Sequence, residues 1–244
     1  MKERKKVHSS FHDLSPREYM YFPKGTLEMG KPGKFSKKEI LNLLLAMGVL
    51  TIAFSFTTSG NNIILSGFDN LDKFPSSLLL SFLGIVSAFF VHELSHKFMA
   101  QKYGLWSEFR VYPQGLLVSF ILAFLTGFVV AAPGAVMFRG ESRIFETGRI
   151  AAAGSSANIV TAGITLILYN VFFETENIGI LFAFICLVNI LLATFNLLPF
   201  SPLDGSKVIR WNGIIWSILF IISIVILFLL FQQGIPNFLS FISK

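Results

Sequence analysis

The sequence is short of cysteine and of charged residues. Its 244 residues include one cysteine, Cys186, which lies in an apolar run. A single cysteine excludes a disulfide framework within the chain and a zinc site built from cysteines. Charged residues make up 14% of the chain and hydrophobic residues 53%, whereas ordinary soluble domains carry roughly 25% charged residues. This composition predicts a membrane protein.

The positive charge of the chain is concentrated beside apolar segments. The formal net charge is +6, which by itself could suggest a nucleic-acid partner. Lys and Arg next to apolar segments instead follow the positive-inside rule for membrane proteins, so we expect no nucleic acid to bind. Residues 1–39 are expected to form a basic cytosolic tail, residues 40–232 the membrane-embedded domain, and residues 233–244 a short C-terminal tail.

Six apolar segments follow the basic tail, at roughly 40–58, 77–100, 116–138, 148–173, 178–198 and 212–232. A membrane-spanning helix needs about 20 residues, and five segments meet this length comfortably. The segment 116–138 differs, because Gly127 interrupts it and Pro133-Gly134 ends its apolar run. Basic residues lie on both of its flanks, namely Lys102, Arg110, Arg139, Arg143 and Arg149.

Basic residues on both flanks predict that the segment 116–138 enters the membrane and turns back. We therefore expect an all-α polytopic membrane protein. It would have five to six transmembrane helices and a short membrane-embedded re-entrant or β element. The same charge pattern predicts a multi-pass protein of the cell membrane with its N-terminus in the cytoplasm.

Ionisable residues interrupt the second apolar segment. Residues 78–91 read LLLSFLGIVSAFFV, and His92-Glu93-Leu94-Ser95-His96 follow. Such groups cost about 3 kcal/mol each at membrane depth and mark functional sites. Residues four apart share a helix face, so His92 and His96 can bind one Zn²⁺, with Glu93 beside the open position as a general base. The pattern predicts a zinc hydrolase inside a bilayer; a pair of structural core histidines is the alternative.

A catalytic zinc ion usually takes three protein ligands. The candidate for the third is Asp204, in the stretch NLLPFSPLDG at 196–205, because it follows the fifth apolar segment at the end where the histidines lie. Asp204-Gly205 alone is an ordinary turn dipeptide, and only the helix motif makes it a candidate. Asn196, which opens this stretch, could instead cap a helix end or join two helices by a hydrogen bond.

HELSH followed by NLLPFSPLDG resembles the site-2 protease family of intramembrane zinc metalloproteases, whose second pattern is close to N-x-x-P-x-x-P-x-D-G. The stretch AGSSAN at 153–158 is similar to the family's A-G-P-x-x-N, with Ser155 in place of proline. Ser206 stands where many members have a second glycine. The resemblance covers about residues 77–211.

This resemblance implies one zinc ion per chain, held by His92, His96 and Asp204, with Glu93 activating water and Asn196 at the cleavage centre. The run AAPGAVMF at 131–138 resembles a membrane-embedded strand of the family, although a loop between helices is the alternative. Such a strand would bind an unwound substrate by strand addition, through the residues Pro133, Gly134, Ala135 and Val136.

The implied function is hydrolysis of peptide bonds within or near transmembrane segments, with a transmembrane protein or peptide and the lipid bilayer as partners. No PDZ module is expected between the fourth and fifth segments, which only a few polar residues separate. One alternative is a membrane zinc protease with a glutamate as third ligand, from Glu141 or Glu146. Another is a non-catalytic zinc-binding membrane protein or transporter, although the other apolar segments hold almost no ionisable residues.

Overall fold

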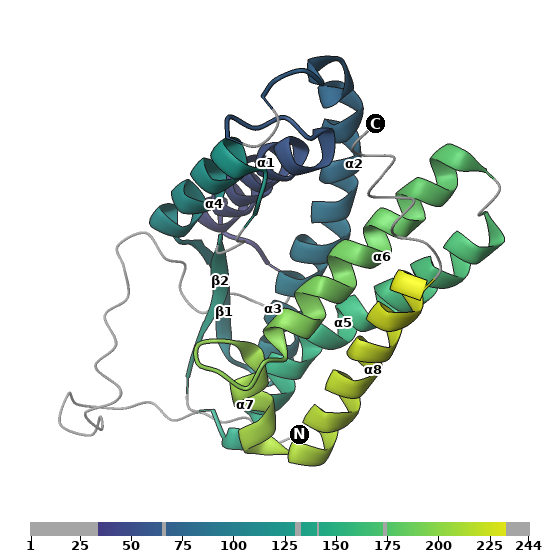
Figure 1. Ribbon diagram of the computed structural model, residues 1–244. Coiled ribbons are helices and arrows are strands. Elements are labelled where there is room, and N and C mark those ends of the chain that lie inside the picture. Colours follow the sequence, from purple (N-terminus) through teal and green to yellow (C-terminus); the bar gives the residue numbers. More distant parts are fainter. Residues whose placement is uncertain (1–33, 65–66, 130–132, 141, 173–174, 233–244) are drawn as a thin grey trace.

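The computed structural model describes residues 34–64, 67–129, 133–140, 142–172 and 175–232 (Figure 1). Residues 1–33 and the C-terminal tail 233–244 lie outside the described residues. Three positions named in the sequence analysis also lie outside them: Ala131, Ala132 and Glu141. The proposed boundaries of the two tails stay predictions.

Helices dominate the fold. The helical elements are α1 (Lys37–Ser59), α2 (Phe74–Ile85), α3 (Val91–Lys102), α4 (Pro113–Thr126), α5 (Ile144–Val171), α6 (Glu176–Asn196), α7 (Asp204–Trp211) and α8 (Gly213–Gln232). A 3₁₀ turn at Leu71–Lys73 and a π-helical turn at Val86–Phe90 join with α2 and α3 into one long helix.

Among the described residues, five helical segments are long and apolar enough to cross a membrane: Lys37–Ser59, Leu71–Lys102, Ile144–Val171, Ile178–Asn196 and Gly213–Gln232. These correspond to the five apolar segments that met the spanning length in the sequence. The predicted fold class is confirmed, since the structure adds one small sheet to these helices. The chain is a multi-pass membrane protein.

The segment 116–138 does not form one crossing helix. The chain leaves strand β1 (Trp106–Val111), runs through α4, and returns as strand β2 (Gly134–Arg139), which pairs antiparallel with β1. Helix α4 ends at Gly127, whose φ of 73° is a left-handed conformation that stops the helix. With 14 residues it is about 21 Å long, short of the hydrocarbon core. The segment therefore turns back toward its starting point.

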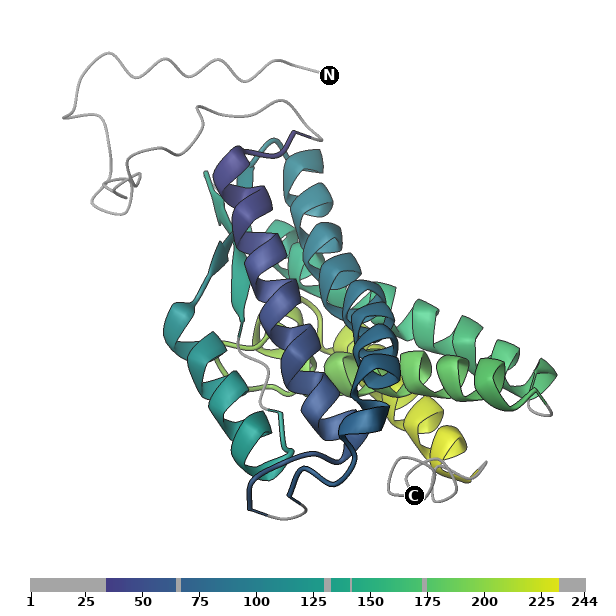
Figure 2. The same ribbon diagram turned by 90° about the horizontal axis from the view of Figure 1, so that it is seen from above.

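Helix α5 lies at the centre of the helical packing. It contacts α3, α6, α7 and α8, and Figure 1 shows it behind α6 and α8. Small buried residues, including Ala151, Gly154 and Ala162, let these neighbours approach closely. On the other side of the molecule, α1 lies between α2 and α4 (Figure 2).

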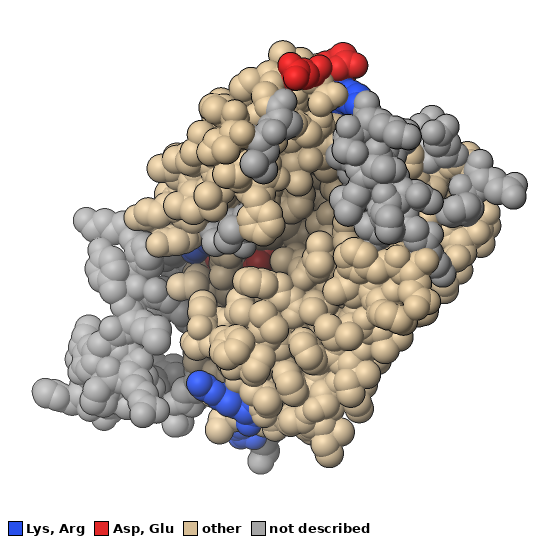
Figure 3. All heavy atoms as spheres, viewed as in Figure 1, with Lys and Arg blue, Asp and Glu red and all other residues tan. Residues whose placement is uncertain are grey.

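The charged side chains lie mainly at the two ends of the helices. Asp69 and Asp72 follow α1, whereas Lys102, Arg143, Arg149, Lys207 and Arg210 lie at the end where α3 finishes and α5 begins. Figure 3 shows a face almost free of charge between the two ends, with a hollow in its middle. Exposed apolar residues such as Leu41, Ile167 and Ile214 fit contact with lipid. Which end faces the cytoplasm stays a prediction.

Candidate metal centre

His92 and His96 lie on one face of α3, directly after the π-helical turn Val86–Phe90. Their Nε2 atoms are 2.9 Å apart, and both side chains are buried. The four-residue spacing places the two rings one above the other, as the sequence predicts. Two ring nitrogens this close together share either a proton or a metal ion.

Asp204 reaches the histidines from the far end of the chain. After α6 the backbone folds back through residues 197–203, and Asp204 is the first residue of α7. Its Oδ2 lies 2.9 Å from His96 Nε2 and 3.4 Å from His92 Nε2. The next residue, Gly205, sits against the backbone of α6: a Cβ there would lie 2.1 Å from the carbonyl oxygen of Leu197. Only glycine permits this approach.

The three groups satisfy the geometry of a metal site. One ligand atom from each of His92, His96 and Asp204 lies within 4.8 Å of the others, and all three residues are buried. The second oxygen of Asp204 accepts a hydrogen bond of 3.0 Å from Lys207 Nζ. Burial raises the pKa of Asp204, but the positive charge that His96 carries when it is protonated, the close contacts with both imidazole rings and the Lys207 charge outweigh it. They hold the pKa well below its usual range, so the carboxylate is available as a ligand.

The contact at Nδ1 of each imidazole ring determines which ring nitrogen carries the proton when the ring is neutral. Nδ1 of His96 lies 2.7 Å from the carbonyl oxygen of Ile150. A carbonyl can only accept, so the proton of a neutral His96 is on Nδ1 and its Nε2 presents a lone pair. Nδ1 of His92 lies 2.5 Å from Oδ1 of Asn158.

The orientation of the Asn158 amide follows from its other contacts. Its Nδ2 donates to the carbonyl oxygen of Ala88 and to Oδ1 of Asn189, so its Oδ1 must be the group that faces His92. Asn189 is fixed in turn, because its own Nδ2 donates to the carbonyl oxygen of Ile185. His92 therefore also presents a lone pair at Nε2. Two imidazole lone pairs and one carboxylate form the donor set of a catalytic zinc site.

Glu93 is buried beside this group and is held by the small sheet. Its Oε2 accepts a hydrogen bond of 2.9 Å from the backbone N–H of Val136 on β2. Val136 pairs with Phe109 of β1, whose own N–H points the other way, to Oε1 of Glu39. In an antiparallel pair of this kind the backbone groups of both residues point away from the partner strand. The outer edge of β2 therefore faces the general-base candidate.

Two proteins of Methanocaldococcus jannaschii resemble the chain in sequence. The first, MJ0611, bears a provisional name as a zinc metalloprotease; it is 37% identical over 186 residues, which are 76% of this chain and 90% of that protein. The chain belongs to this family of zinc metalloproteases. The second, zinc metalloprotease MJ0392, is 30% identical over 173 residues, or 70% of this chain and 43% of its own length. No family model and no solved structure matches.

Its membership of this family, its buried His-His-Asp group and its long apolar helices identify the chain as a membrane zinc metalloprotease. Of the alternative third ligands, Glu146 serves elsewhere in this metalloprotease: its carboxylate accepts the backbone N–H of Arg143 at the start of α5. Glu141 lies outside the described residues.

A buried ion pair joins three elements of the metalloprotease next to the metal group. Nζ of Lys97, the residue after His96, lies 2.9 Å and 2.8 Å from the two carboxylate oxygens of Glu39 on α1. Lys97 also donates to the carbonyl oxygen of Ser107 on β1. Helix α3 thus holds β2 through Glu93 and β1 through Lys97. No sequence pattern marks this pair, because Glu39 falls at the junction between the basic tail and the first span.

The other predicted site residues lie as follows. The amide of Asn196 donates a hydrogen bond of 3.0 Å back to the carbonyl oxygen of Leu192 in its own helix, so its part at the cleavage centre stays a prediction.

The predicted substrate-binding residues lie in or beside β2. Pro133 is buried, and its carbonyl oxygen accepts the N–H of Tyr112. Gly134, Ala135 and Val136 are in β2. By the alternation of the ladder, Ala135 faces β1 with its backbone groups, while Gly134 and Val136 face outward.

Proposed function

We propose that this metalloprotease is a site-2-type protease that hydrolyses peptide bonds within or near transmembrane segments of other proteins. The observation that carries the proposal is the place of the metal group in the long helix Leu71–Lys102. His92 lies ten residues before the end of that helix, or about 15 Å along its axis. A substrate bond that reaches this depth belongs to a membrane-embedded segment.

One zinc ion per chain, held by His92, His96 and Asp204, would supply Lewis acidity toward a water molecule and a substrate carbonyl. Glu93 takes a proton from the attacking water as general base and returns it to the leaving amine as general acid. The hydrogen bond from Val136 fixes the direction in which the Glu93 carboxylate points. Asn196, which the resemblance places at the cleavage centre, would donate to the developing oxyanion.

The outer edge of β2 is the proposed substrate-binding strand. A peptide bond inside a helix is shielded by the helical hydrogen bonds, so the cleaved segment must unwind first. An extended segment that pairs with the outward backbone groups of Gly134 and Phe138 and with the carbonyl oxygen of Val136 would recover hydrogen bonds by strand addition. Because Glu93 contacts the same edge at Val136, the paired substrate would run beside the general base.

The test is cleavage by the purified protein in detergent, with synthetic transmembrane peptides as substrates, in the presence and absence of a zinc chelator. One peptide carries Gly and Asn near its centre, a second carries only Leu there, and a third is a water-soluble peptide of the same length. We expect chelator-sensitive cleavage of the first and slower cleavage of the second, because each Gly lowers the cost of unwinding by about 1 kcal/mol. Cleavage of the soluble peptide alone would contradict the proposal, and bound zinc without any cleavage would favour a non-catalytic protein.

A further inference from the structure

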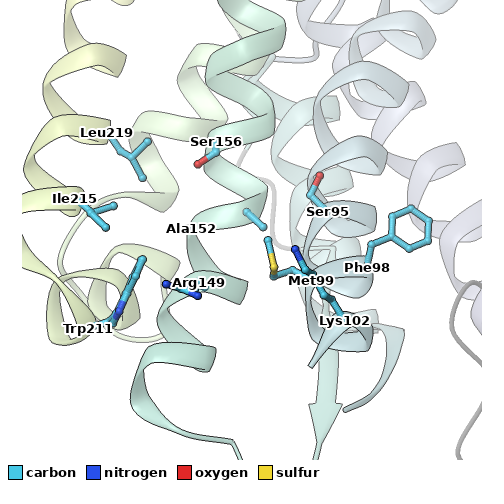
Figure 4. Close-up of a pocket in the computed structure, with 11 residues that line it drawn as sticks. Ser95, Phe98, Met99, Lys102, Arg149, Ala152, Ser156, Trp211, Ile215 and Leu219 are labelled. Carbon is cyan, nitrogen blue, oxygen red and sulfur yellow. The ribbon is translucent and has the colours of Figure 1, made fainter. Parts of the chain in front are cut away.

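A groove separate from the metal group opens on the side of the molecule where α3, α5 and α8 meet. Its volume is about 640 Å³. Figure 4 shows α5 as its floor, with α3 on one side and α8 on the other. The floor is low because the α5 residues there are small: Ala152, Ala153 and Ser156.

The lining of the groove is apolar over most of its length. Met99 and Phe98 of α3 line it on one side, and Ile215 and Leu219 of α8 on the other. All of these residues belong to the two long apolar segments that end and begin near this level. An apolar groove between membrane helices is filled by hydrocarbon, because water gains no hydrogen bonds there.

Two cations line the same end of the groove, one on α3 and one on α5. Lys102 is the last residue of α3, and Arg149 is in the second turn of α5. Figure 4 shows both at the same end as Trp211, with Ser95 and Ser156 toward the other end. In the described part of the chain neither cation has a carboxylate partner. Both side chains are exposed at this end of the groove, so their charge is accessible to an anionic ligand.

Arg149 is held in place by aromatic neighbours. It donates 3.3 Å to the hydroxyl of Tyr103, and its guanidinium lies 5.6 Å from the ring centres of Phe145 and of Trp211. Tyr and Trp gather at the headgroup level of a membrane. An arginine fixed at this level is suited to bind phosphate oxygens, since its planar fork loses little freedom on binding.

We propose that this groove binds one anionic phospholipid of the surrounding bilayer. Its phosphate would lie between Lys102 and Arg149, and an acyl chain would follow the floor from Ala152 toward Ser156. Basic pockets at the ends of membrane helices recognise anionic headgroups by this combination of charge and aromatic residues. The inference does not depend on the proposed proteolysis, because binding can be measured without a substrate.

The position of the groove couples the lipid to the metal group. The α5 residues of its floor flank Gly154, which packs against the rings of His92 and His96, and Ile150, whose carbonyl oxygen binds His96. One wall of the groove is α3, the helix that carries both histidines. A bound acyl chain would therefore hold α3 and α5 at the spacing that the metal ligands require.

The experiment measures retention of lipid by the purified protein after exchange into vesicles or nanodiscs of defined composition. The probes are phosphatidylglycerol, which is anionic, and phosphatidylcholine, which has no net charge. We expect selective retention of phosphatidylglycerol and a higher melting temperature in its presence. Lys102→Gln and Arg149→Gln should each weaken retention by about fivefold. Lys38→Gln, which removes an exposed cation at the same end of the molecule, should leave it unchanged.

A second variant separates the groove from a simple surface charge. Ser156→Phe keeps both cations and fills the floor, and it should abolish retention if an acyl chain lies there. Equal retention of the two lipids by the wild-type protein would overturn the proposal. So would full retention by Ser156→Phe alongside loss in the charge variants, since the headgroup alone would then bind. Zinc content and melting temperature in phosphatidylcholine identify any variant that fails to fold, and the remaining variants then decide.

Discussion

The carboxylate of Glu93 accepts a hydrogen bond of 2.9 Å from the backbone N–H of Val136. This contact links the helix of the metal ligands to the outer edge of the two-stranded sheet, across 43 residues of chain from Glu93 to Val136. It uses the single donor of Val136 that faces away from β1. The general-base candidate and the proposed substrate strand are therefore parts of one arrangement.

Replacing Val136 by proline deletes this donor and should lower kcat by about 10- to 100-fold, the effect of one hydrogen bond to a charged group. Bound zinc should be unchanged, because no ligand is altered. Val136→Thr keeps the N–H and the branched side chain, and it serves as the matched control. Unimpaired turnover by the proline variant would remove the contact from the mechanism.

Two glycines of α5 offer a matched test of the metal group. A Cβ at Gly154 would lie 2.5 Å from Nε2 of His96, whereas a Cβ at Gly163 would meet nothing within 4 Å. Gly154→Ala should therefore displace the histidines and lower bound zinc, although no ligand is removed. Gly163→Ala should keep full zinc and stabilise the helix by up to about 1 kcal/mol. Elemental analysis of both variants checks this, and equal zinc in the two would count against the geometry described.

Asn158 orients His92 through the shortest contact of the metal group, 2.5 Å from Oδ1 to Nδ1. Asn158→Leu removes the acceptor that selects the Nδ1 proton, and we expect zinc affinity to fall by about 10- to 100-fold. Competition with a chromophoric chelator measures the change. Thr161→Val is the control on the same helix, because the Thr161 hydroxyl donates only to the carbonyl oxygen of Ala157. An unchanged affinity in Asn158→Leu would show that the amide does not tune the metal.

Topology is open to a labelling test. Both flanks of the segment 116–138 are predicted to be cytoplasmic, and the loop before α2 to be external. In a Cys186→Ala background, cysteines at Arg110 and Arg143 should react with a membrane-impermeant reagent from the same side. A cysteine at Asp72 should react from the opposite side. If the cysteines at Arg110 and Arg143 react from opposite sides, the segment crosses the membrane and the predicted topology is wrong.

The sequence alone predicted the parts of the fold that depend on hydropathy and on local spacing. Five spans follow from apolar length, and the pairing of His92 with His96 follows from the helical repeat. Asp204 could be named because a second motif marked it. Strand β1 was missed, since residues 106–111 mix aromatic and charged side chains without a clear alternation.

Contacts between distant segments could not be predicted in the same way. The pair Glu39–Lys97 and the amides Asn158–Asn189 are separated by 58 and 31 residues, and no local pattern marks their partners. Ser155, which replaces the proline of the family's A-G-P-x-x-N pattern, does not disturb the group of His92, His96 and Asp204. Its side chain is buried, and within the described residues its hydroxyl has no hydrogen-bond partner. Helix α7 is not predicted by the sequence, because its eight residues are too few for a periodic signal.

The central claim is that Glu93 activates water beside a zinc ion held by His92, His96 and Asp204. The most direct measurement determines zinc content and cleavage of a transmembrane peptide together, for the wild-type protein, Glu93→Gln and Asp204→Ala. The account predicts about one zinc per chain in the wild type and in Glu93→Gln, with cleavage abolished in Glu93→Gln because an amide cannot accept the proton. Asp204→Ala should lose zinc and activity together, since two histidines remain. Turnover by Glu93→Gln, or full zinc in Asp204→Ala, would contradict it.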